Sequence, residues 1–261
     1  MEFFPVEANL RQSFRVLATD RTGADVMELP GVSIASLGVA FQMFNAAYLN
    51  SMVENEEEMH SCLELAQTHF QTRGIAWSFW ICEDWLTRPL RRKLSRICQN
   101  FDLRLVSEMP GMTADTVKAA RRPLPDLEIR RVDSLPVLHD FQAIGSTCFH
   151  VPPAWFSEVF DERRAARGEF ACFVGYRDGE PVATAASVPS QGAIGIYNVA
   201  TSPGHRERGY GEIMTRHAID ASLKEYPGSQ TVLQATWQGL SLYERMGFRA
   251  VTRFSVYNSS R

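Results

Sequence analysis

The sequence predicts a mixed α/β protein, with a mostly antiparallel sheet and helices on both faces, built in two copies. Three observations favour this fold class. Apolar stretches with strand character alternate with segments of helical periodicity. Two runs of 25 residues, 29–53 and 181–205, contain no Asp, Glu, Lys or Arg. Each run precedes the same predicted order of helix, strand, helix and strand, and a length of 261 residues accommodates two small domains.

In the first copy, the uncharged run is expected to be largely extended, and two helices and two strands follow it. Residues 54–73 have apolar side chains at helical spacing, and residues 75–81 (IAWSFWI) are typical of a buried strand. Residues 89–100 then predict a second helix, and residues 101–105 predict the closing strand. The apolar positions that define the first helix are Met59, Leu63, Ala66 and Phe70.

The second copy starts with an edge strand and a helix, predicted at residues 126–132 and 135–149. Two apolar runs, 170–177 and 181–188, then flank Asp178-Gly179-Glu180. Asp-Gly between apolar runs predicts a β-hairpin, because glycine adopts positive φ without steric cost. The sheet of this copy therefore begins with antiparallel strands.

After its uncharged run, the second copy repeats the order of the first. Residues 211–225 predict a helix that ends at Pro227-Gly228, and residues 231–235 predict a strand. Residues 240–246 and 248–257 predict the last helix and the last strand.

A polar segment between the copies, residues 113–125 (TADTVKAARRPLP), predicts a linker because it is poor in large apolar residues and ends in prolines. We therefore predict a first domain at residues 1–120 and a second at residues 121–261.

Residues 197–211 (YNVATSPGHRERGYG) carry the most informative motif, since they lie between a predicted strand and a predicted helix. Arg206, Gly209 and Gly211 give the spacing Arg-x-x-Gly-x-Gly. Glycines let backbone N–H groups approach an anion, and the helix N-terminus adds partial positive charge, so this turn suits a pyrophosphate. A tight connection without a ligand is the alternative. The chain lacks the GxxxxGK[ST] of a P-loop and the third glycine of a dinucleotide turn.

A second motif, Leu242–Phe248 (LYERMGF), follows the strand predicted at 231–235. Together the two motifs resemble the GNAT superfamily of acetyl-CoA-dependent N-acetyltransferases, whose pattern pairs an Arg/Gln-x-x-Gly-x-Gly/Ala loop with a later Leu-Tyr-x-x-x-Gly-Phe. The resemblance covers residues 170–257 well. The first copy matches only in outline and has no such loop after Asn45. The resemblance implies an acyl-CoA N-acyltransferase-like fold in both copies, with residues 1–120 a degenerate copy and residues 121–261 the catalytic one.

The resemblance further implies an enzyme that transfers acetyl from acetyl-CoA to a primary amine by direct attack. The strand that ends near Thr201 would offer backbone groups to the pantetheine arm, and the glycine turn would hold the pyrophosphate. A strand N–H would stabilise the oxyanion, and Tyr243 would protonate the leaving thiolate. The implied catalytic residues are Tyr243 and Asn198. The implied cofactor-binding residues are Val199, Ala200, Thr201, Arg206, Glu207, Arg208, Gly209, Tyr210, Gly211, Thr236 and Tyr243.

Two positions depart from the family pattern. Thr236 stands where many members have an asparagine that contacts the cofactor, and its shorter side chain reaches less far. Tyr197 and Asn198 occupy the region where many members carry a glutamate base, and neither is a good base at neutral pH. The base is therefore unassigned, with His150, Glu169 and a water held by Asn198 as candidates.

Composition excludes several classes of protein. The formal charge of −3 is divided almost evenly between the halves, which argues against a nucleic-acid binder. Five cysteines without a CxxC pair, and an N-terminus without a signal-peptide pattern, favour the cytoplasm. The histidines show no HExxH motif and no Cys/His pairing, so we expect no metal. Polar residues interrupt the uncharged runs, so we expect no membrane span. A monomer or a homodimer fits these expectations.

Other functions stay open at this point. The missing glutamate is compatible with a non-catalytic acyl-CoA-binding or sensing module. Transfer of a different acyl group, or of an aminoacyl group from a charged tRNA, is a further alternative, although the balanced charge argues against tRNA. An acyl-enzyme on Cys148 or Cys172 conflicts with the usual burial of free cysteines. The acceptor, a small-molecule or peptide amine, is unknown, and its recognition is expected to depend on residues 135–168 and on the first copy.

Overall fold

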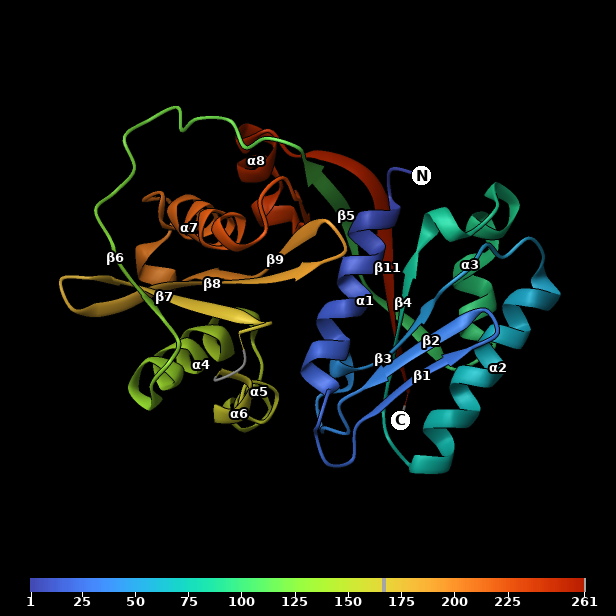
Figure 1. Ribbon diagram of the computed structural model, residues 1–261. Coiled ribbons are helices and arrows are strands. Elements are labelled where there is room, and N and C mark those ends of the chain that lie inside the picture. The colour runs from blue at the N-terminus through green and yellow to red at the C-terminus, as the bar shows by residue number, and fades with distance from the viewer. Residues whose placement is uncertain (166–167, 261) are drawn as a thin grey trace. The chain divides into compact units, whose positions relative to one another are not determined.

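The computed structural model describes residues 1–165 and 168–260 of the chain (Figure 1). Its helices are α1 (Phe4–Ala18), α2 (Glu56–Arg73), α3 (Arg88–Gln99), α4 (Leu135–Phe149), α5 (Pro153–Val159), α6 (Glu162–Ala165), α7 (Tyr210–Glu225) and α8 (Trp237–Met246). Its strands are β1 (Asp25–Leu29), β2 (Val32–Ser36), β3 (Asn45–Leu49), β4 (Ser78–Cys82), β5 (Leu103–Ala114), β6 (Glu128–Arg131), β7 (Ala171–Arg177), β8 (Glu180–Ser190), β9 (Ala193–Thr201), β10 (Gln230–Gln234) and β11 (Arg249–Ser259). The predicted mixed α/β fold class is confirmed.

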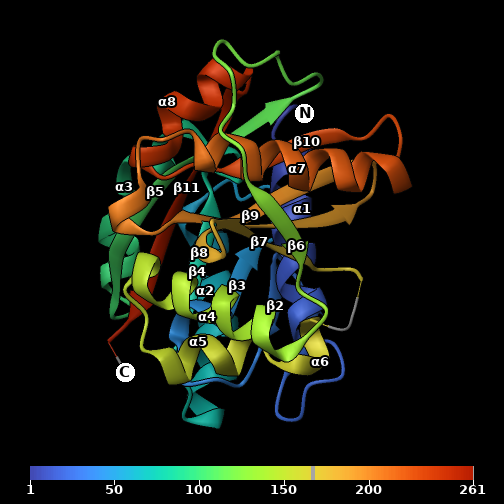
Figure 2. The ribbon, with the colours of Figure 1, turned by 90° about the vertical axis from the view of Figure 1, so that its left-hand side faces the viewer.

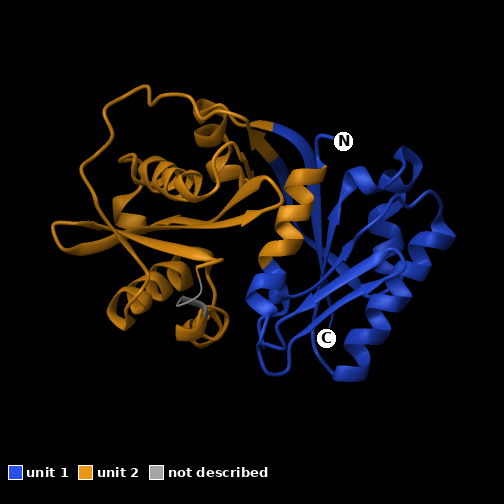
Figure 3. Cartoon of the chain, viewed as in Figure 1, with its two compact units in different colours: residues 1–3, 14–111, 250–261 blue, residues 4–13, 112–249 orange. Residues whose placement is uncertain are grey.

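Two compact units make up the chain, and neither is one continuous stretch of sequence (Figure 3). Unit 1 contains residues 1–3, 14–111 and 250–261, and unit 2 contains residues 4–13 and 112–249. Each unit thus includes a short segment from the far end of the chain. The division into residues 1–120 and 121–261 describes a repeat in the sequence and stays a prediction, whereas packing assigns residues 4–13, 112–120 and 250–261 differently.

Unit 1 orders its strands β1-β2-β3-β4-β11-β5. β1, β2 and β3 pair antiparallel, and β3 then pairs parallel with β4. β11 pairs antiparallel with β4, with Phe254 opposite Cys82. The last strand of the chain therefore lies in the sheet of the first half.

An ion pair stabilises β11 at this position. Glu83 directly follows β4 and is only 5% exposed. Its carboxylate accepts hydrogen bonds from Arg253 Nε at 2.8 Å and Arg253 Nη2 at 2.7 Å, and from Ser255 Oγ at 2.7 Å. A buried carboxylate requires such partners. Because β11 supplies them, these contacts stabilise the pairing of β11 with β4.

Unit 2 orders its strands β10-β9-β8-β7-β6, and the end of β5 lies beyond β10. β6 to β9 pair antiparallel, and β9 pairs parallel with β10. α7 covers one face of this sheet, and α4 contacts β7, β8 and β9 on the other (Figure 2). The core between α7 and the sheet includes Ile194, Ile196, Met214, Ala218 and Leu233.

The first half of α1 belongs to unit 2 because Asn9 binds strands β8 and β9. Its Nδ2 donates to the carbonyls of Val188 and Ala193 at 3.0 and 3.4 Å, and its Oδ1 accepts from the Tyr197 hydroxyl at 2.6 Å. Asn9 is completely buried. A Cβ at Gly195 would overlap Asn9 Oδ1, so this close approach requires glycine in β9.

Most predicted elements are confirmed, with three differences. Helices α1, α5 and α6 and strands β1 and β2 were not predicted individually. β5 extends to Ala114, so the connection between the halves begins at Asp115 rather than Thr113. α8 begins at Trp237 rather than Leu240, because the Thr236 hydroxyl caps it. Among the described helices, none combines the length and the apolar character that crossing a membrane requires.

Replacing Asn9 tests whether the N-terminal segment is part of unit 2. Asn9→Ala removes the hydrogen bonds of a fully buried side chain to two carbonyls and to the Tyr197 hydroxyl, so we expect the free energy of unfolding to fall by about 3 kcal/mol in urea denaturation. Asn100→Ala, at an exposed helix end, is the control and should change stability by less than about 0.5 kcal/mol. Equal, small losses in both variants would contradict the assignment.

Candidate functional site

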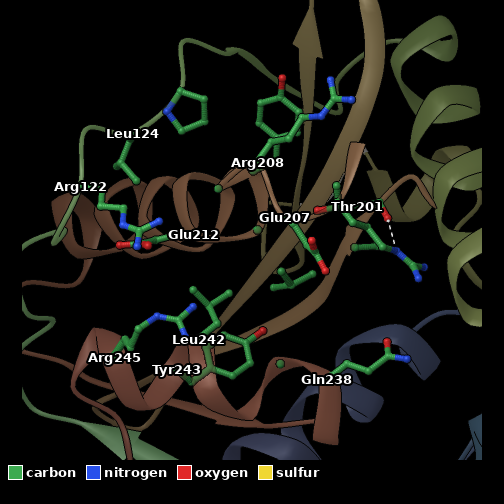
Figure 4. Close-up of a pocket in the computed structure, with 18 of the residues that line it drawn as sticks. Arg122, Leu124, Thr201, Glu207, Arg208, Glu212, Gln238, Leu242, Tyr243 and Arg245 are labelled. Atoms are coloured by element: carbon green, nitrogen blue, oxygen red, sulfur yellow. Dashed lines mark hydrogen bonds between the residues drawn. The ribbon is translucent and has the colours of Figure 1, made fainter. Parts of the chain in front are cut away.

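A cleft of about 1130 Å³ in unit 2 is lined by the end of β9, the first turn of α7, α8 and the segment that precedes β6 (Figure 4). Sites for drug-sized molecules usually measure about 300–1,000 Å³, so this cleft accommodates a long ligand. The structure brings every predicted cofactor-binding residue to its walls: Val199, Ala200, Thr201, Arg206, Glu207, Arg208, Gly209, Tyr210, Gly211, Thr236 and Tyr243. Asn198 precedes Val199 and is not among the lining residues.

A β-bulge distorts β9 just before the cleft. Ala186 pairs with Tyr197 but Thr184 pairs with Ala200, so two residues of β9 face one residue of β8. Asn198 has φ of +49°, the left-handed conformation, and its carbonyl accepts a hydrogen bond from Thr184 Oγ1 at 2.8 Å. A bulge of this kind bends the strand that carries the extra residue.

β9 and β10 separate beyond the start of their pairing. The parallel register joins residues 193–195 of β9 to residues 230–232 of β10 and ends there. The second half of β9, from Ile196 to Thr201, therefore has its β8 partner on one side only. Backbone N–H and C=O groups on the open side are available to a ligand that lies along the strand.

The turn after β9 presents the N-terminus of α7 to the cleft. Gly209 has φ of +87° and Glu207 has φ of +64°, and α7 begins at Tyr210. The first N–H groups of a helix have no partner within it and attract anions. Arg206 Nε donates to Thr201 O at 3.2 Å, and Arg208 Nη2 donates to Gly204 O at 3.1 Å, so both side chains help to fix the turn.

Tyr243 of α8 is 8% exposed, and its hydroxyl points into the cleft (Figure 4). Burial, which disfavours the phenolate, raises the pKa of Tyr243 to about 12, and a hydrogen bond with Thr215 lowers it in part. The ring packs edge-on against Phe248, 5.8 Å between centroids. Tyr243 is therefore a neutral hydrogen-bond donor at physiological pH.

Thr236 has a structural task as well as a place in the cleft. Its Oγ1 accepts from the N–H of Gly239 at 3.3 Å and caps α8. The hydroxyl hydrogen remains available toward a ligand, while the oxygen is engaged. Its capping role therefore limits the reach of Thr236 toward a ligand.

The three candidate bases differ in position. His150 and Glu169 are both exposed and lie outside the lining of the cleft. Asn198 Nδ2 is buried and, within the described residues, has no hydrogen-bond partner. A buried amide donor without a partner is a position where a water or a substrate group is expected.

Several lining residues lie outside the two motifs and were not predicted. They are Ala119, Arg121, Arg122, Pro123, Leu124, Pro125, Cys148, Phe149, Glu212, Gln238, Gly239, Leu242 and Arg245. Those from 119 to 125 belong to the segment that was predicted to be a linker. Its paired arginines and its prolines are the sequence features that could have indicated a binding role. Cys148 Sγ contacts Thr201 O at 3.4 Å, and burial raises the pKa of its thiol, which disfavours a nucleophilic thiolate.

The corresponding place in unit 1 is built differently. After β3, Val53 forms a parallel bridge with Leu86, so contact between these neighbouring segments continues. α2 then starts with Glu56, Glu57 and Glu58. Asn55 Oδ1 accepts from Glu58 N at 3.0 Å, and Glu58 Oε2 accepts from Glu54 N at 2.8 Å. The N-terminus of this helix is thus capped by the Asn55 side chain and has three carboxylates in its first turn.

The described residues contain no group of three or more His, Cys, Asp or Glu side chains arranged to hold a metal ion.

Part of the second half of the chain is similar to a known family. Residues 168–250 match the family model of an acetyltransferase (GNAT) domain. The matched residues include the turn and Tyr243. No curated protein sequence matches significantly.

Solved structures with the same fold span the whole chain. A GCN5-related N-acetyltransferase from Kribbella flavida is 16% identical, with a TM-score of 0.73 over 98% of this chain and 96% of that chain. A putative acetyltransferase of the GNAT family from Novosphingobium aromaticivorans is 15% identical, with a TM-score of 0.58 over 99% and 96%. A tandem GNAT protein from the clavulanic acid biosynthesis pathway is 8% identical, with a TM-score of 0.55 over 99% and 93%. These likenesses show the fold.

The raised pKa of Tyr243 gives a direct spectroscopic prediction. Because the phenolate of Tyr243 forms only near pH 12, ultraviolet titration of Tyr243→Phe should coincide with that of the unsubstituted protein up to about pH 11. Loss of one tyrosine that titrates near pH 10, the ordinary value, would show that the side chain is solvated instead of buried.

Proposed function

We propose that the chain is an acetyl-CoA-dependent N-acetyltransferase that moves an acetyl group to a primary amine by direct attack. The observation that carries the proposal is that one cleft combines an unpaired strand end, a glycine turn at a helix N-terminus and a buried, neutral tyrosine. The GNAT domain at residues 168–250 supports acyl-CoA-dependent acetyl transfer in general.

The turn and the strand end bind the two parts of the donor. Backbone N–H groups of residues 206–211 hold the pyrophosphate, because glycine at 209 and 211 lets the chain approach the anion closely. The open side of residues 198–201 pairs with the amides of the pantetheine arm, as an added strand pairs with a sheet edge. This places the thioester toward the inner end of the cleft.

The amine nitrogen attacks the thioester carbonyl carbon, and negative charge collects on the carbonyl oxygen. A backbone N–H of the open strand end donates to this oxyanion. The C–S bond then breaks, the Tyr243 hydroxyl protonates the leaving thiolate, and the nitrogen loses a proton to a base. The products are an amide and free CoA. Because its pKa is about 12, Tyr243 holds its proton at neutral pH and is available as the donor.

Asn198 positions the water that takes the proton from the amine. The bulge turns this residue away from regular pairing, and its Nδ2 is buried and unpartnered among the described residues. His150 and Glu169 are exposed and outside the lining of the cleft, whereas Asn198 directly precedes the lining residue Val199 and has a buried amide, which favours Asn198.

The first half does not bind a second donor, in our proposal. A pyrophosphate at the start of α2 would meet three glutamates in the first turn, where the N–H group of Glu58 is already capped by Asn55. The first half instead forms a degenerate copy of the fold. The acceptor is a small-molecule or peptide amine, and its recognition depends on the segment 135–168. Residues 166 and 167 of this segment lie outside the described residues.

A non-catalytic acyl-CoA-binding module is the second candidate function. The observation that favours it is that β9 offers Tyr197 and Asn198, and no carboxylate, in the region before the turn. The two functions share the binding site and differ in whether an amine releases the thiol.

Binding of acetyl-CoA tests the site. Isothermal titration should give one site per chain, and Arg206→Glu with Gly209→Glu should abolish binding, because the turn would carry negative charge and lose its left-handed glycine. The matched control is Arg104→Glu with Gly192→Glu, an exposed arginine outside the cleft and a glycine of equally positive φ with open space around it. Unchanged binding in the turn variant would refute the site assignment.

Tyr243→Phe tests the chemistry. With thiol release measured over a panel of primary amines, we expect kcat to fall by about 10²- to 10⁴-fold, the usual contribution of a general acid, and the Kd for acetyl-CoA to change less than about threefold. Unchanged kcat would show that Tyr243 only packs. If the unsubstituted protein binds acetyl-CoA but no amine in the panel accelerates release, the non-catalytic module is favoured.

A further inference from the structure

The connection between the halves is attached to unit 2 at both ends and forms one wall of the cleft. Near its start, Lys118 N donates to Met246 O at the end of α8, at 2.8 Å. Near its end, Asp126 O accepts from Arg177 Nη1 of β7 at 3.1 Å. Between these two attachments, residues 119 and 121–125 all line the cleft. We call residues 118–126 the strap.

Two glycines let the strap pack closely. A Cβ at Gly247, which has φ of +99°, would lie 2.9 Å from Lys118 Cγ. A Cβ at Gly209 would lie 3.1 Å from Pro125 Cδ. The second contact joins the strap to the turn that begins α7. The strap is therefore positioned against the phosphate-binding turn and does not merely pass over it.

Two arginines of the strap line the cleft. Arg121 and Arg122 are exposed and line the cleft, and Figure 4 shows Arg122 extending from the strap toward α7. Within the described part of the chain, neither guanidinium forms a hydrogen bond or ion pair. The cleft as a whole is lined by five arginines and two glutamates, which favours a ligand of high negative charge.

The chemistry of the donor leaves one phosphate without a place in the proposed site. The nucleotide of acetyl-CoA carries a pyrophosphate and a separate 3′-phosphate, and a phosphate monoester adds about −1.5 to −2 charge at pH 7. The turn and helix α7 account for the pyrophosphate. Arginine binds phosphate oxygens through two parallel hydrogen bonds. The exposed Arg121 and Arg122 in the lining of the cleft are therefore suited to bind the 3′-phosphate.

We propose that Arg121 and Arg122 of the strap recognise the 3′-phosphate of the acyl-CoA donor and make the site selective for CoA over 3′-dephospho-CoA. This inference rests on the proposed function and assigns specificity to residues outside the GNAT domain match at 168–250. It gives the connection between the halves a task in substrate selection.

Binding of two donors tests the proposal. Isothermal titration with acetyl-CoA and with acetyl-3′-dephospho-CoA should give the unsubstituted protein at least about a tenfold preference for acetyl-CoA at 50 mM salt. Arg121→Gln with Arg122→Gln should weaken acetyl-CoA about tenfold or more and leave acetyl-3′-dephospho-CoA within about twofold. The control, Arg92→Gln with Arg104→Gln, removes the same charge from exposed arginines outside the cleft and should preserve the preference.

The outcomes separate this inference from the proposed function. Equal affinity of the unsubstituted protein for both donors, or equal loss for both donors in the strap variant, overturns the role of the strap and leaves acyl-CoA binding intact. Loss of the preference in the control as well would show a general charge effect and would also overturn it. Failure of the unsubstituted protein to bind either donor refutes the proposed function, and the inference with it.

Discussion

The left-handed backbone of Asn198 is the constraint on which the site depends. One additional residue in β9 at this point changes its register against β8, and the pairing with β10 has already ended at Gly195. The strand therefore leaves an open edge just where the chain turns into α7. An open strand edge and a helix N-terminus thus border one cleft, and Tyr243 reaches the same cleft from α8. Asn9 supports this arrangement by binding β9 through Tyr197.

The local part of the site could be predicted from the sequence. The spacing of Arg206, Gly209 and Gly211 encodes a turn and a helix start within a few residues, and Leu242–Phe248 encodes a capped helix that carries a tyrosine. Features of this kind depend on neighbours in the chain, so the pattern alone specifies them. The repeated order of helices and strands was predictable for the same reason, and both halves contain it.

The remaining features depend on contacts between distant residues, which a single sequence does not specify. Nothing near Asn9 indicates that it bonds with residues 188–197, and nothing in β11 indicates that Glu83 accepts from Arg253 and Ser255. The strap was likewise predicted to be a polar linker. Its attachment to unit 2 depends on hydrogen bonds with Met246 and Arg177, which are distant in the sequence. The sequence thus indicates the local conformation of these segments but not the distant residues that they contact.

The two halves share an order of elements and differ at the helix start that follows the central strand. Hydrogen–deuterium exchange with and without acetyl-CoA tests this asymmetry most directly. The account predicts slower exchange on binding for amides at residues 196–213 and 236–245, and no change at residues 50–60, where α2 is capped by Asn55 and starts with three glutamates. Protection at residues 50–60 comparable to that at residues 196–213 would contradict the assignment of one donor site to the second half.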